Sequence, residues 1–367
     1  MMKIIFVSYV HTPDYKNPAE WLEHIKFYTG VLQALAKKHE VISIELIDFE
    51  GEYVQNFVHY RFKRISKPEL YFPIKLHHFI KATKPDVVIV HGLHFSFQII
   101  QLRMVLGKYV KIIAQHHAEA PFKRFRKPLQ QLADKYIKAY LFASKEIGIE
   151  WVEKGNLASA AKIFEVMEVS STFYPLEREK ISKGLNITKT LTFLWVGRLN
   201  NNKDPLTVVK AFLQFSLVFP SAKLFMIYQS EELLPDISNL IDKYPIDKCS
   251  ITLIGKVPHQ DLLYWYNNSD FIISGSKYEG SGTAVCEAMS CGCIPIVTDI
   301  PAFRMITNNG QYGLIYQPGN PEALLSSLKK AIDIDLFDMR TQVIDHFKDK
   351  LSFDAIASDI EQVILSD

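Results

Sequence analysis

Cysteine is scarce in this sequence, and its spacing forms no metal motif. The 367 residues contain four cysteines, Cys249, Cys286, Cys291 and Cys293. Paired C-x-x-C spacing is absent, so a structural zinc site is disfavoured, and so few cysteines do not make a disulfide framework in a chain of this length. We expect buried thiols and a reducing, cytoplasmic setting.

A long apolar run is also lacking. The run that comes nearest to the length of a membrane-spanning helix, residues 87–102, holds two His and two Gln. The N-terminal apolar run, residues 3–10, is too short for a signal peptide and predicts a buried strand. We therefore expect no leader and no membrane-spanning segment.

Two common nucleotide-binding motifs are missing. The chain has no G-x-x-x-x-G-K-[ST] loop, and its first predicted strand is followed by Thr12-Pro13 instead of G-x-G-x-x-G. These absences disfavour an ATPase and an ordinary dehydrogenase. The only D-x-D, at Asp333 and Asp335, falls in a predicted helix, a poor place for a metal ion that must face a diphosphate.

Composition and charge describe an ordinary globular chain with an uneven charge distribution. Hydrophobic residues make up 48% and charged residues 22%, and the length is about 2.4 times a typical domain of roughly 150 residues, which predicts two domains. The net charge is +2. It divides into +7 through Pro175 and −5 after it. No nucleic-acid-binding motif accompanies the basic half, and we expect no nucleic-acid partner.

Short apolar runs alternate with longer helical patterns along the whole chain. This alternation predicts an α/β fold of two doubly wound, Rossmann-like domains that face a central cleft. The domains are predicted at 1–172 and 173–350, with the polar stretch 168–186 as linker and a C-terminal helix, 351–367, packed back on the first domain. The expected strands are 3–10, 41–47, 86–90, 111–114, 140–143, 163–166, 192–196, 223–228, 250–254, 271–274 and 294–298, and the expected helices are 17–38, 74–82, 129–140, 204–219, 259–267 and 283–291.

The segment richest in chemistry runs from residue 274 to 297 and reads as strand, glycine-rich turn and helix. The small residues Gly280, Ser281 and Gly282 allow a ligand to approach the backbone, and the free N–H groups at the helix start suit a phosphate. Glu279 and Glu287 would repel a phosphate, so we expect them to accept hydrogen bonds from neutral hydroxyls such as those of a sugar. The alternative is a plain glycine turn with Glu287 on a solvated helix face.

A second segment, residues 193–206, places cations just beyond a predicted strand. Arg198 and Lys203 could neutralise a diphosphate without a metal ion. Asp204 and Pro205 are expected to begin the next helix as its cap and first residue. The alternative is a pair of solvated surface cations.

Together these segments resemble the Glu-x7-Glu family of retaining, GT-B-fold nucleotide-sugar glycosyltransferases, the group 1 enzymes of family 4. The resemblance covers the second domain, including V-G-R-L at 196–199, K-D-P at 203–205 and the two glutamates eight positions apart. It implies a donor domain at 173–350, an acceptor domain at 1–172 and a reaction without a metal ion or other cofactor. The donor site it implies comprises Gly197, Arg198, Lys203, Lys256, Val257, Glu279, Gly280, Ser281, Gly282, Thr283 and Glu287.

The resemblance also implies separate roles within this site. Arg198 and Lys203 hold the donor diphosphate, and Glu279 with the amides of 280–283 meets the donor sugar and phosphate. Glu287 binds ribose hydroxyls, and residues 256–258 lie near the base. The family often has Pro-Ser before the first glutamate and Phe between the two glycines. Gly275, Ser276 and Ser281 stand there in this chain.

The first domain carries histidines after two predicted strands. By resemblance, His117 meets the donor sugar near the reaction centre and joins Glu279, Arg198 and Lys203 as a catalytic residue. His116, one residue away, is the alternative, and His11, His91 and His116 are expected on the acceptor side. A metal cluster of His91, His94, His116 and His117 is a further, disfavoured alternative.

Two basic segments of the first domain suggest an anionic partner. One is residues 123–127, K-R-F-R-K, and the other comprises Arg61, Lys63, Arg64 and Lys67. They could hold the protein on the inner face of a membrane, where a lipid-linked acceptor would be found. Solvated basic loops are the alternative.

These observations predict a glycosyltransferase that moves a sugar from a nucleoside diphosphate sugar to an acceptor hydroxyl with retention, in cell-envelope or exopolysaccharide synthesis. A glycan or lipid-linked glycan is the expected acceptor. The alternatives are a nucleotide-sugar epimerase of the same fold, a glycan phosphorylase and a non-catalytic sugar-nucleotide-binding subunit. A phosphorylase would usually show a pyridoxal-phosphate lysine, and this sequence has no recognisable context for one.

Overall fold

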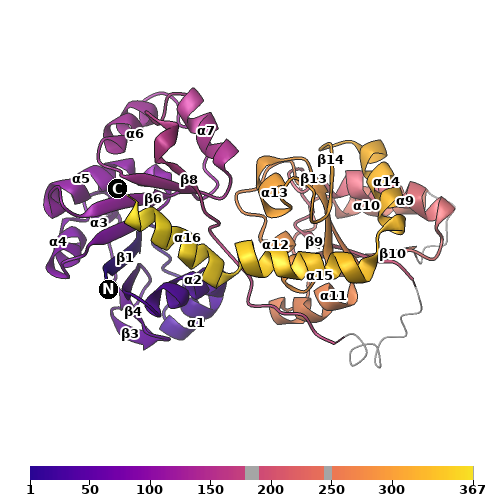
Figure 1. Cartoon of the computed structure of the whole chain (residues 1–367), viewed down its shortest axis with the longest axis horizontal. Coiled ribbons are helices and arrows are strands. Elements are labelled where there is room, and N and C mark those ends of the chain that lie inside the picture. Colours follow the sequence, from indigo (N-terminus) through magenta and orange to yellow (C-terminus); the bar gives the residue numbers. More distant parts are fainter. Residues whose placement is uncertain (178–189, 244–249, 367) are drawn as a thin grey trace. The chain divides into compact units, whose positions relative to one another are not determined.

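The computed structural model describes residues 1–177, 190–243 and 250–366 (Figure 1). These residues form two compact units: unit 1 comprises Met1–Ser170 and the C-terminal segment from Phe353, and unit 2 comprises Ser171–Ser352. The expected division after residue 172 lies two residues from the observed one. Part of the expected linker, 178–186, lies outside the described residues, as does Cys249.

Unit 1 is built on an eight-stranded sheet of order β3-β4-β2-β1-β5-β6-β7-β8. Neighbouring strands are parallel except β3 and β4, which form an antiparallel hairpin. The parallel strands are covered on both faces, so their inner residues form continuous apolar runs that the sequence displays directly. The strands are β1 (Lys3–Ser8), β2 (Glu40–Glu45), β3 (Gly51–Gln55), β4 (Val58–Phe62), β5 (Val87–His91), β6 (Lys111–Gln115), β7 (Ala139–Phe142) and β8 (Ile163–Glu165).

The helices of unit 1 differ from the expected ones in two places. The single helix expected at 17–38 is two helices that meet at Ile25, and the helix expected at 129–140 ends at Asp134. The second prediction was wrong because Lys138 already bonds the sheet through its N–H to the carbonyl of Ile112, and Tyr140 is buried in β7. The helices are α1 (Pro18–His24), α2 (Lys26–Ala36), α3 (Lys67–Tyr71), α4 (Ile74–Ala82), α5 (Ser96–Leu106), α6 (Arg126–Asp134), α7 (Lys145–Glu153) and α16 (Phe353–Leu365), with 3-10 turns η1 (Leu93–Phe95) and η2 (Ala160–Lys162).

Unit 2 repeats the architecture with a six-stranded parallel sheet of order β11-β10-β9-β12-β13-β14. Its strands are β9 (Thr192–Gly197), β10 (Lys223–Tyr228), β11 (Ile251–Gly255), β12 (Phe271–Ser274), β13 (Ile294–Thr298) and β14 (Leu314–Tyr316). Its helices are α9 (Pro205–Val218), α10 (Leu234–Asp242), α11 (Leu262–Asn268), α12 (Thr283–Ser290), α13 (Pro301–Ile306), α14 (Pro321–Lys330) and α15 (Leu336–His346), with short helical turns η4 (His259–Asp261), η5 (Ala331–Asp333) and η6 (Phe347–Leu351).

The D-x-D sequence was expected inside one helix, and that expectation was wrong. Asp333 ends the turn η5, and Asp335 caps α15 by accepting hydrogen bonds from the N–H groups of Phe337 and Asp338 at 3.0 and 3.1 Å. A capping carboxylate satisfies the first free N–H groups of a helix. Asp335 therefore has a structural task at this position.

The C-terminal helix α16 returns to unit 1 and packs against α2 (Figure 1). Glu361 accepts from Lys38 at 2.7 Å and from His39 at 3.1 Å, and Asp354 pairs with Lys37 at 2.6 Å. Exposed ion pairs of this kind add little stability. The apolar face of the helix, on which Ile360 is 1% exposed, accounts for the docking.

Replacing Ile360 by Ala is expected to lower the free energy of unfolding by about 2–4 kcal/mol, because a buried aliphatic side chain leaves a cavity behind. Chemical denaturation followed by circular dichroism measures the change. Leu365→Ala is the control on the same helix; Leu365 is 64% exposed, so its loss should cost less than about 0.5 kcal/mol. Equal losses for both variants would contradict the docking of α16 on unit 1.

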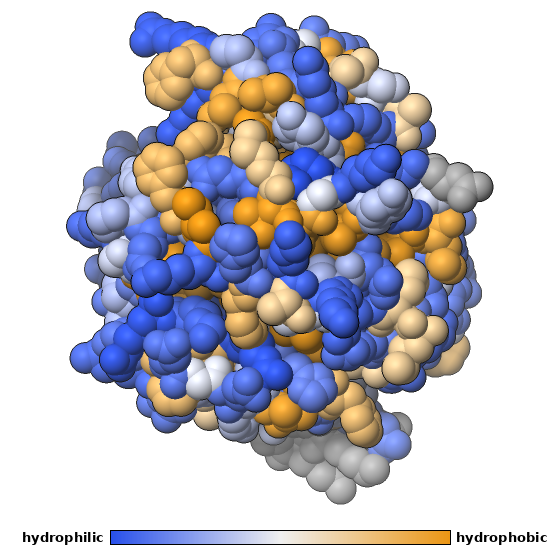
Figure 2. Space-filling view, turned by 90° about the vertical axis from the view of Figure 1, so that its left-hand side faces the viewer, coloured by the Kyte–Doolittle hydropathy of each residue, from blue (hydrophilic) through white to orange (hydrophobic). Residues whose placement is uncertain are grey.

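The surface of unit 1 carries several large apolar side chains. Figure 2 shows, on the side of the molecule that unit 1 forms, apolar patches among mainly hydrophilic residues. Tyr71 at the end of α3, Phe72 after it and Ile74 at the start of α4 are 66%, 60% and 52% exposed, and Phe125 is 77% exposed. Among the described residues no helix is long and apolar enough to cross a membrane.

Candidate functional site

In unit 2, the loops that follow the adjacent strands β9 and β12 come together. Lys203, in the loop after β9, forms an ion pair between its Nζ and Oε1 of Glu279, in the turn after β12. The two loops are also joined through Asn202, whose side-chain amide donates to the carbonyl of Tyr278 at 3.0 Å and whose own carbonyl accepts from the N–H of Lys277 at 2.8 Å. Two residues that the sequence separates by 76 positions thus lie at one sheet edge, where α/β folds bind ligands.

Glycine is required twice in the turn between β12 and α12. A Cβ at Gly275 would lie 2.9 Å from the carbonyl oxygen of Asp204, so the close approach of the two loops depends on its absence. Gly282, the N-cap of α12, has φ +60°, and a Cβ there would meet the Phe303 ring at 2.8 Å. Gly275, which departs from the family's usual proline, therefore allows the contact that places Lys203 beside Glu279.

Glu287 lies on α12 and is 6% exposed. Its Oε1 accepts from Nε2 of His259 at 2.7 Å, and its Oε2 accepts from the hydroxyl of Tyr266 at 3.1 Å. The alternative that placed this carboxylate on a solvated helix face is wrong. A buried carboxylate held by two hydrogen bonds keeps further lone pairs that can accept ligand hydroxyls.

The remaining predicted donor residues occupy the same edge with different exposure. Arg198 directly follows β9 and is exposed, and no described residue forms an ion pair with it. Lys256 follows β11 and is exposed, whereas Val257 packs partly buried against the core of unit 2. Lys203, Glu279 and Gly282 line one small cavity of about 20 Å³, and Gly197, Gly280, Ser281 and Thr283 are all half-buried.

Asp204 stands at the N-cap of α9 as expected, and its side chain has a different partner. It has φ +44°, and its Oδ2 accepts from the hydroxyl of Thr207 at 2.9 Å instead of from the first backbone N–H groups. Lys277 lies 3.7 Å from the same oxygen. The carboxylate therefore fixes the loop that carries Lys203.

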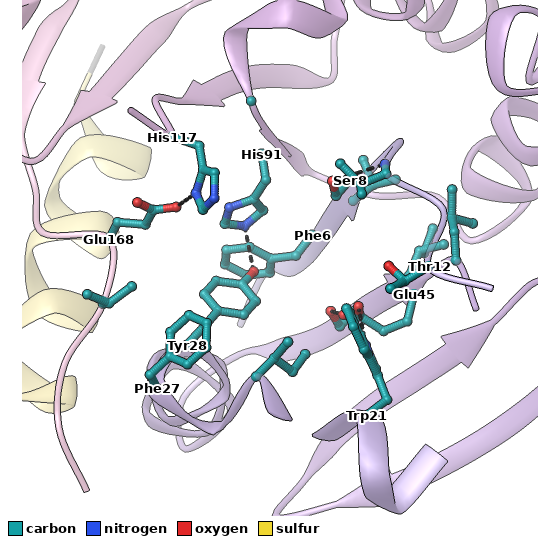
Figure 3. A pocket seen from close by; sticks show the side chains of 18 of the residues that line it. Phe6, Ser8, Thr12, Trp21, Phe27, Tyr28, Glu45, His91, His117 and Glu168 are labelled. Atoms are coloured by element: carbon teal, nitrogen blue, oxygen red, sulfur yellow. Dashed lines mark hydrogen bonds and ion pairs between the residues drawn. The ribbon is translucent and has the colours of Figure 1, made fainter. Parts of the chain in front are cut away.

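Unit 1 contains a pocket at the carboxyl ends of β1, β2, β5 and β6 (Figure 3). Apolar and aromatic side chains form most of it, among them Phe6, Trp21, Phe27 and Tyr28. Its polar members are Ser8, Thr12, Ser43, Glu45, His91, His94, His117 and Glu168.

His117 projects from the loop after β6 and pairs through Nδ1 with Oε1 of Glu168, which follows β8. The imidazole is 62% exposed and the carboxylate 9% exposed. The hydrogen bond to Glu168 is the main cause of a raised pKa of His117, and burial opposes it. This pair favours the protonated imidazolium, with one N–H held by Glu168 and the other directed away from it.

Glu168→Gln is expected to lower the pKa of His117, because the amide removes the negative charge that favours the imidazolium. Histidine NMR signals followed through a pH titration measure this pKa, with His117→Gln to assign the signal. In the wild type the pKa of His117 is higher in the folded than in the unfolded state. The pair therefore stabilises the fold fully at a pH below the ordinary pKa of histidine, and this stabilisation is lost as the pH rises through the raised pKa. An unchanged His117 pKa in the variant would contradict the pairing.

His91, at the end of β5, is held in its neutral form. Burial lowers its pKa to about 3, and its Nε2 lies 2.5 Å from the hydroxyl of Tyr28, whose own pKa burial raises. The Tyr28 and His91 rings meet edge to face with centroids 4.6 Å apart. His91 thus orients Tyr28 in the wall of the pocket.

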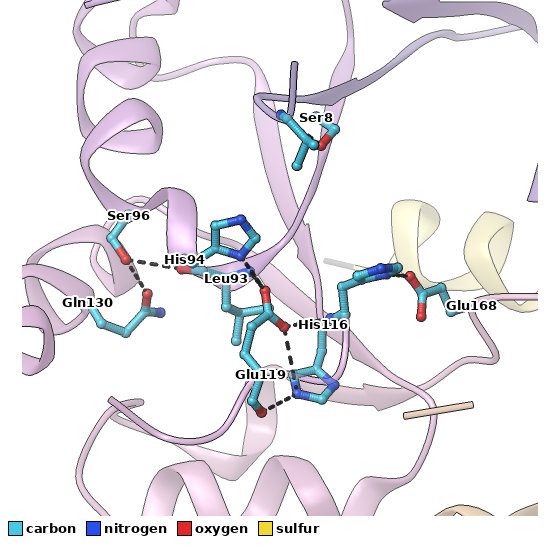
Figure 4. Close-up of polar contacts among 10 residues, drawn as sticks. Ser8, Leu93, His94, Ser96, His116, Glu119, Gln130 and Glu168 are labelled. Carbon is cyan, nitrogen blue, oxygen red and sulfur yellow. Dashed lines mark hydrogen bonds and ion pairs between the residues drawn. The ribbon is translucent and has the colours of Figure 1, made fainter. Parts of the chain in front are cut away.

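Glu119 joins the loops that follow β5 and β6 (Figure 4). Its Oε1 accepts from the N–H of Leu93 at 2.7 Å and lies 2.8 Å from Nδ1 of His94, and its Oε2 accepts from the N–H of His117 at 2.6 Å. Burial opposes its ionisation, but the hydrogen bonds from His94 and the His117 backbone, with the nearby His116, lower its pKa to about 2. One ionised carboxylate therefore fixes the position of the His117 loop.

The other histidines predicted on the acceptor side lie outside the pocket. His116 is 2% exposed, stacks on Phe142 with centroids 4.7 Å apart, and its Nε2 lies 2.8 Å from the carbonyl oxygen of Glu119. His11 lies between two lining residues, Val10 and Thr12, without lining the pocket itself. Within the described residues, no group of three or more His, Cys, Asp or Glu has an arrangement that could hold a metal ion.

The two basic segments differ in how their charges are paired. Arg61, Lys63 and Arg64 form ion pairs with Glu52, Glu50 and Asp48, respectively. Residues 123–126 are exposed and include the aromatic ring of Phe125. The segment 123–127 is therefore the stronger candidate for an anionic surface.

Two units of Rossmann type, each built on a largely parallel sheet, are the architecture of the GT-B fold. Residues 177–349 match the family model of the glycosyl transferases group 1. This match covers most of unit 2, and solved glycosyltransferase structures share the fold over nearly the whole chain.

Individual relatives are distant. The chain is 24% identical over 262 residues to the GDP-mannose:cellobiosyl-diphosphopolyprenol alpha-mannosyltransferase of Xanthomonas campestris, an alignment that covers 66% of this chain and 64% of the relative. It thus spans just under two thirds of that protein. Among solved structures, a glycosyltransferase from Rickettsia africae has a TM-score of 0.73 at 17% identity, covering 99% of this chain and 97% of that one. HepE of Anabaena, solved with UDP, has a TM-score of 0.75 at 14% identity, covering 99% of each chain.

Among the residues of these sites that the sequence did not indicate are Glu45, Tyr28, Glu119 and Glu168 in unit 1. A signal existed for Glu45, since it is a charged residue at the end of a strand whose residues after Glu40 are all buried and, except for Ser43, apolar. Glu168 had been assigned to the linker. Its pairing with His117 spans 51 residues, and no local pattern indicates such a contact.

Proposed function

We propose that this protein transfers a sugar from a nucleoside diphosphate sugar, bound by unit 2, to a hydroxyl of an acceptor bound by unit 1, with retention of anomeric configuration and without a metal ion. The bond between the anomeric carbon and the diphosphate oxygen breaks, and a bond to the acceptor oxygen forms. The nucleoside diphosphate leaves with the bonding electrons, and the proton of the acceptor hydroxyl passes to the leaving diphosphate or to water.

The observation that carries the proposal is the pairing of Lys203 with Glu279 at the start of α12. An ammonium group has three N–H donors, so Lys203 can keep Glu279 and still reach a phosphate oxygen. Exposed Arg198 adds a second cation at the same sheet edge. Charge that develops on the leaving diphosphate would be stabilised where it appears, which is how fixed cations lower a barrier.

Two measurements test this function. Thermal unfolding with UDP, GDP, ADP and CMP, first without and then with Mg²⁺, should show a raised midpoint with one diphosphate in the absence of metal, because a ligand bound only by the folded state stabilises it. Proton NMR of the product should show the same anomeric configuration as in the donor. No shift with any nucleotide would contradict the donor site, and an inverted product would contradict retention.

The acceptor is proposed to be a glycan of cell-envelope or exopolysaccharide synthesis, carried on a lipid. The Xanthomonas relative supports this proposal, since its name specifies a cellobiosyl-diphosphopolyprenol acceptor and a GDP-mannose donor. Sugar transfer that requires an added acceptor would distinguish this function from epimerisation, which needs none. Binding of a nucleotide without any turnover would favour a non-catalytic subunit.

Peripheral attachment to the cytoplasmic face of a membrane is proposed through residues 123–127, where exposed cations flank the exposed ring of Phe125. Cations attract anionic headgroups and an aromatic ring enters the interface. In co-sedimentation with phosphatidylcholine vesicles that contain 30% phosphatidylglycerol, K123A/R124A should bind less than the wild type. Lys63→Ala is the control, because Lys63 is already paired with Glu50.

A further inference from the structure

The pocket of unit 1 is small and largely aromatic. Its volume is about 230 Å³, which is below the roughly 300–1,000 Å³ of pockets that enclose drug-sized ligands. The rings of Trp21 and Tyr28 contribute to its wall (Figure 3). These dimensions suit one sugar ring better than a longer chain of sugars.

Glu45 is a buried carboxylate in the lining of this pocket. It ends β2, is 9% exposed, and is held by two hydrogen bonds: Oε1 accepts from the hydroxyl of Ser43 at 2.6 Å, and Oε2 accepts from Nε1 of Trp21 at 2.9 Å. Each oxygen retains a lone pair. A fixed carboxylate with free lone pairs accepts hydrogen bonds from neutral hydroxyls, and it repels another carboxylate or a phosphate.

The rest of the pocket offers an anion little compensation. Of the described residues, neither Lys nor Arg lines it. The imidazole of His117 is already paired with Glu168, so that pair adds little net charge. Glu45 forms no ion pair with a described residue, and an anion placed beside it would lose its water without gaining a fixed cation.

We infer that this pocket selects a neutral sugar ring as the acceptor group and rejects sugars that carry a carboxylate or a phosphate, with Glu45 as the residue that determines this specificity. The inference rests on the proposed function, in which unit 1 binds the acceptor. It has a geometric consequence: any phosphate that links the acceptor glycan to a lipid lies outside the pocket, and the ring that enters is the uncharged end of the glycan.

Binding of matched monosaccharides tests the selection without turnover. Saturation-transfer NMR compares the methyl glycosides of glucose, mannose, galactose and N-acetylglucosamine with the methyl glucuronide and mannuronide, which differ from their neutral partners by a carboxylate. At least one neutral glycoside should bind about tenfold or more tightly than its acidic partner. Equal or tighter binding of the acid, or no binding of any neutral glycoside, overturns the inference.

Substitutions then separate charge from shape. Glu45→Gln keeps the shape and removes the charge, so the preference for the neutral glycoside should fall about tenfold, the scale of a hydrogen bond to a charged group. Val10 lines the pocket and is 52% exposed, so Val10→Lys should fold and should raise affinity for the glucuronide about two- to fivefold, the scale of an exposed ion pair. Val54→Lys is the matched control, since Val54 is 59% exposed on β3 and does not line the pocket.

Thermal unfolding with nucleotides, described above, distinguishes failure of this inference from failure of the proposed function. Suppose that a nucleoside diphosphate stabilises the protein, but the protein prefers acidic glycosides, or Val54→Lys raises glucuronide affinity as much as Val10→Lys does. That result overturns only the selection by Glu45 and leaves the proposed function standing. A protein that no nucleoside diphosphate stabilises overturns the proposed function itself.

Discussion

Replacing Lys203 by Ala should lower kcat/KM for the donor by about 10²–10³-fold, the scale expected when one fixed donor to a developing negative charge is removed. The Lys203 side chain is 29% exposed and its ammonium group is already held by Glu279, so it is positioned before the substrate arrives. The charge on the leaving diphosphate grows in the transition state. Most of the loss should therefore appear in kcat, with a smaller rise in KM.

A matched control separates this effect from a general loss of positive charge. Lys210 is exposed on α9 of the same unit, and Lys210→Ala makes the same charge change away from the loop. Its activity should remain within about twofold of the wild type. In a double-mutant cycle, K203A and E279A should be strongly non-additive, because the two side chains contact each other. A K203A enzyme within threefold of the wild type would contradict the assignment of this site.

The parallel strands were the most predictable part of the fold. The inner residues of β1 and β5 are buried on both faces, so each strand reads as an unbroken apolar run. The edge strand β3 was missed for the opposite reason: after Gly51 its residues are exposed, and an exposed strand of mixed polarity has no pattern that separates it from a loop. Its partner β4 alternates buried Val58, Tyr60 and Phe62 with half-buried residues, so it carried a strand signal that the prediction did not use.

The candidate sites of the two units were predictable to different extents. The sequence placed Lys203, Glu279 and Glu287 through their position after strands and their spacing, and the structure joins the first two directly. The protein partners of Glu287 came from η4 and α11, and no spacing indicated them. In unit 1, the sequence singled out His117 but not Glu119, two positions later. The partners of Glu119 are backbone N–H groups and a histidine on two loops, which become neighbours only when β5 and β6 pair.

Glu287→Gln is expected to raise the dissociation constant of the nucleoside diphosphate and the KM of the donor by about 10–100-fold, the scale of one to two hydrogen bonds to a charged acceptor. His259 and Tyr266 each donate to one carboxylate oxygen of Glu287. Each of these oxygens keeps one further acceptor position, which a ribose hydroxyl could use. The ribose is remote from the bond that breaks and is bound equally in ground and transition states. The kcat should therefore change little.

Isothermal titration with the diphosphate that stabilises the protein, and with its 2′-deoxy and 3′-deoxy analogues, tests the contact itself. If Glu287 binds the ribose, the substitution should weaken the ribonucleotide much more than at least one deoxy analogue, because that analogue has already lost the hydroxyl in question. Glu322→Gln, at an exposed position of α14, is the control and should bind like the wild type. Equal weakening of all three ligands, with a lowered unfolding midpoint of the free protein, would instead mean that Glu287 only holds His259 and Tyr266 in place.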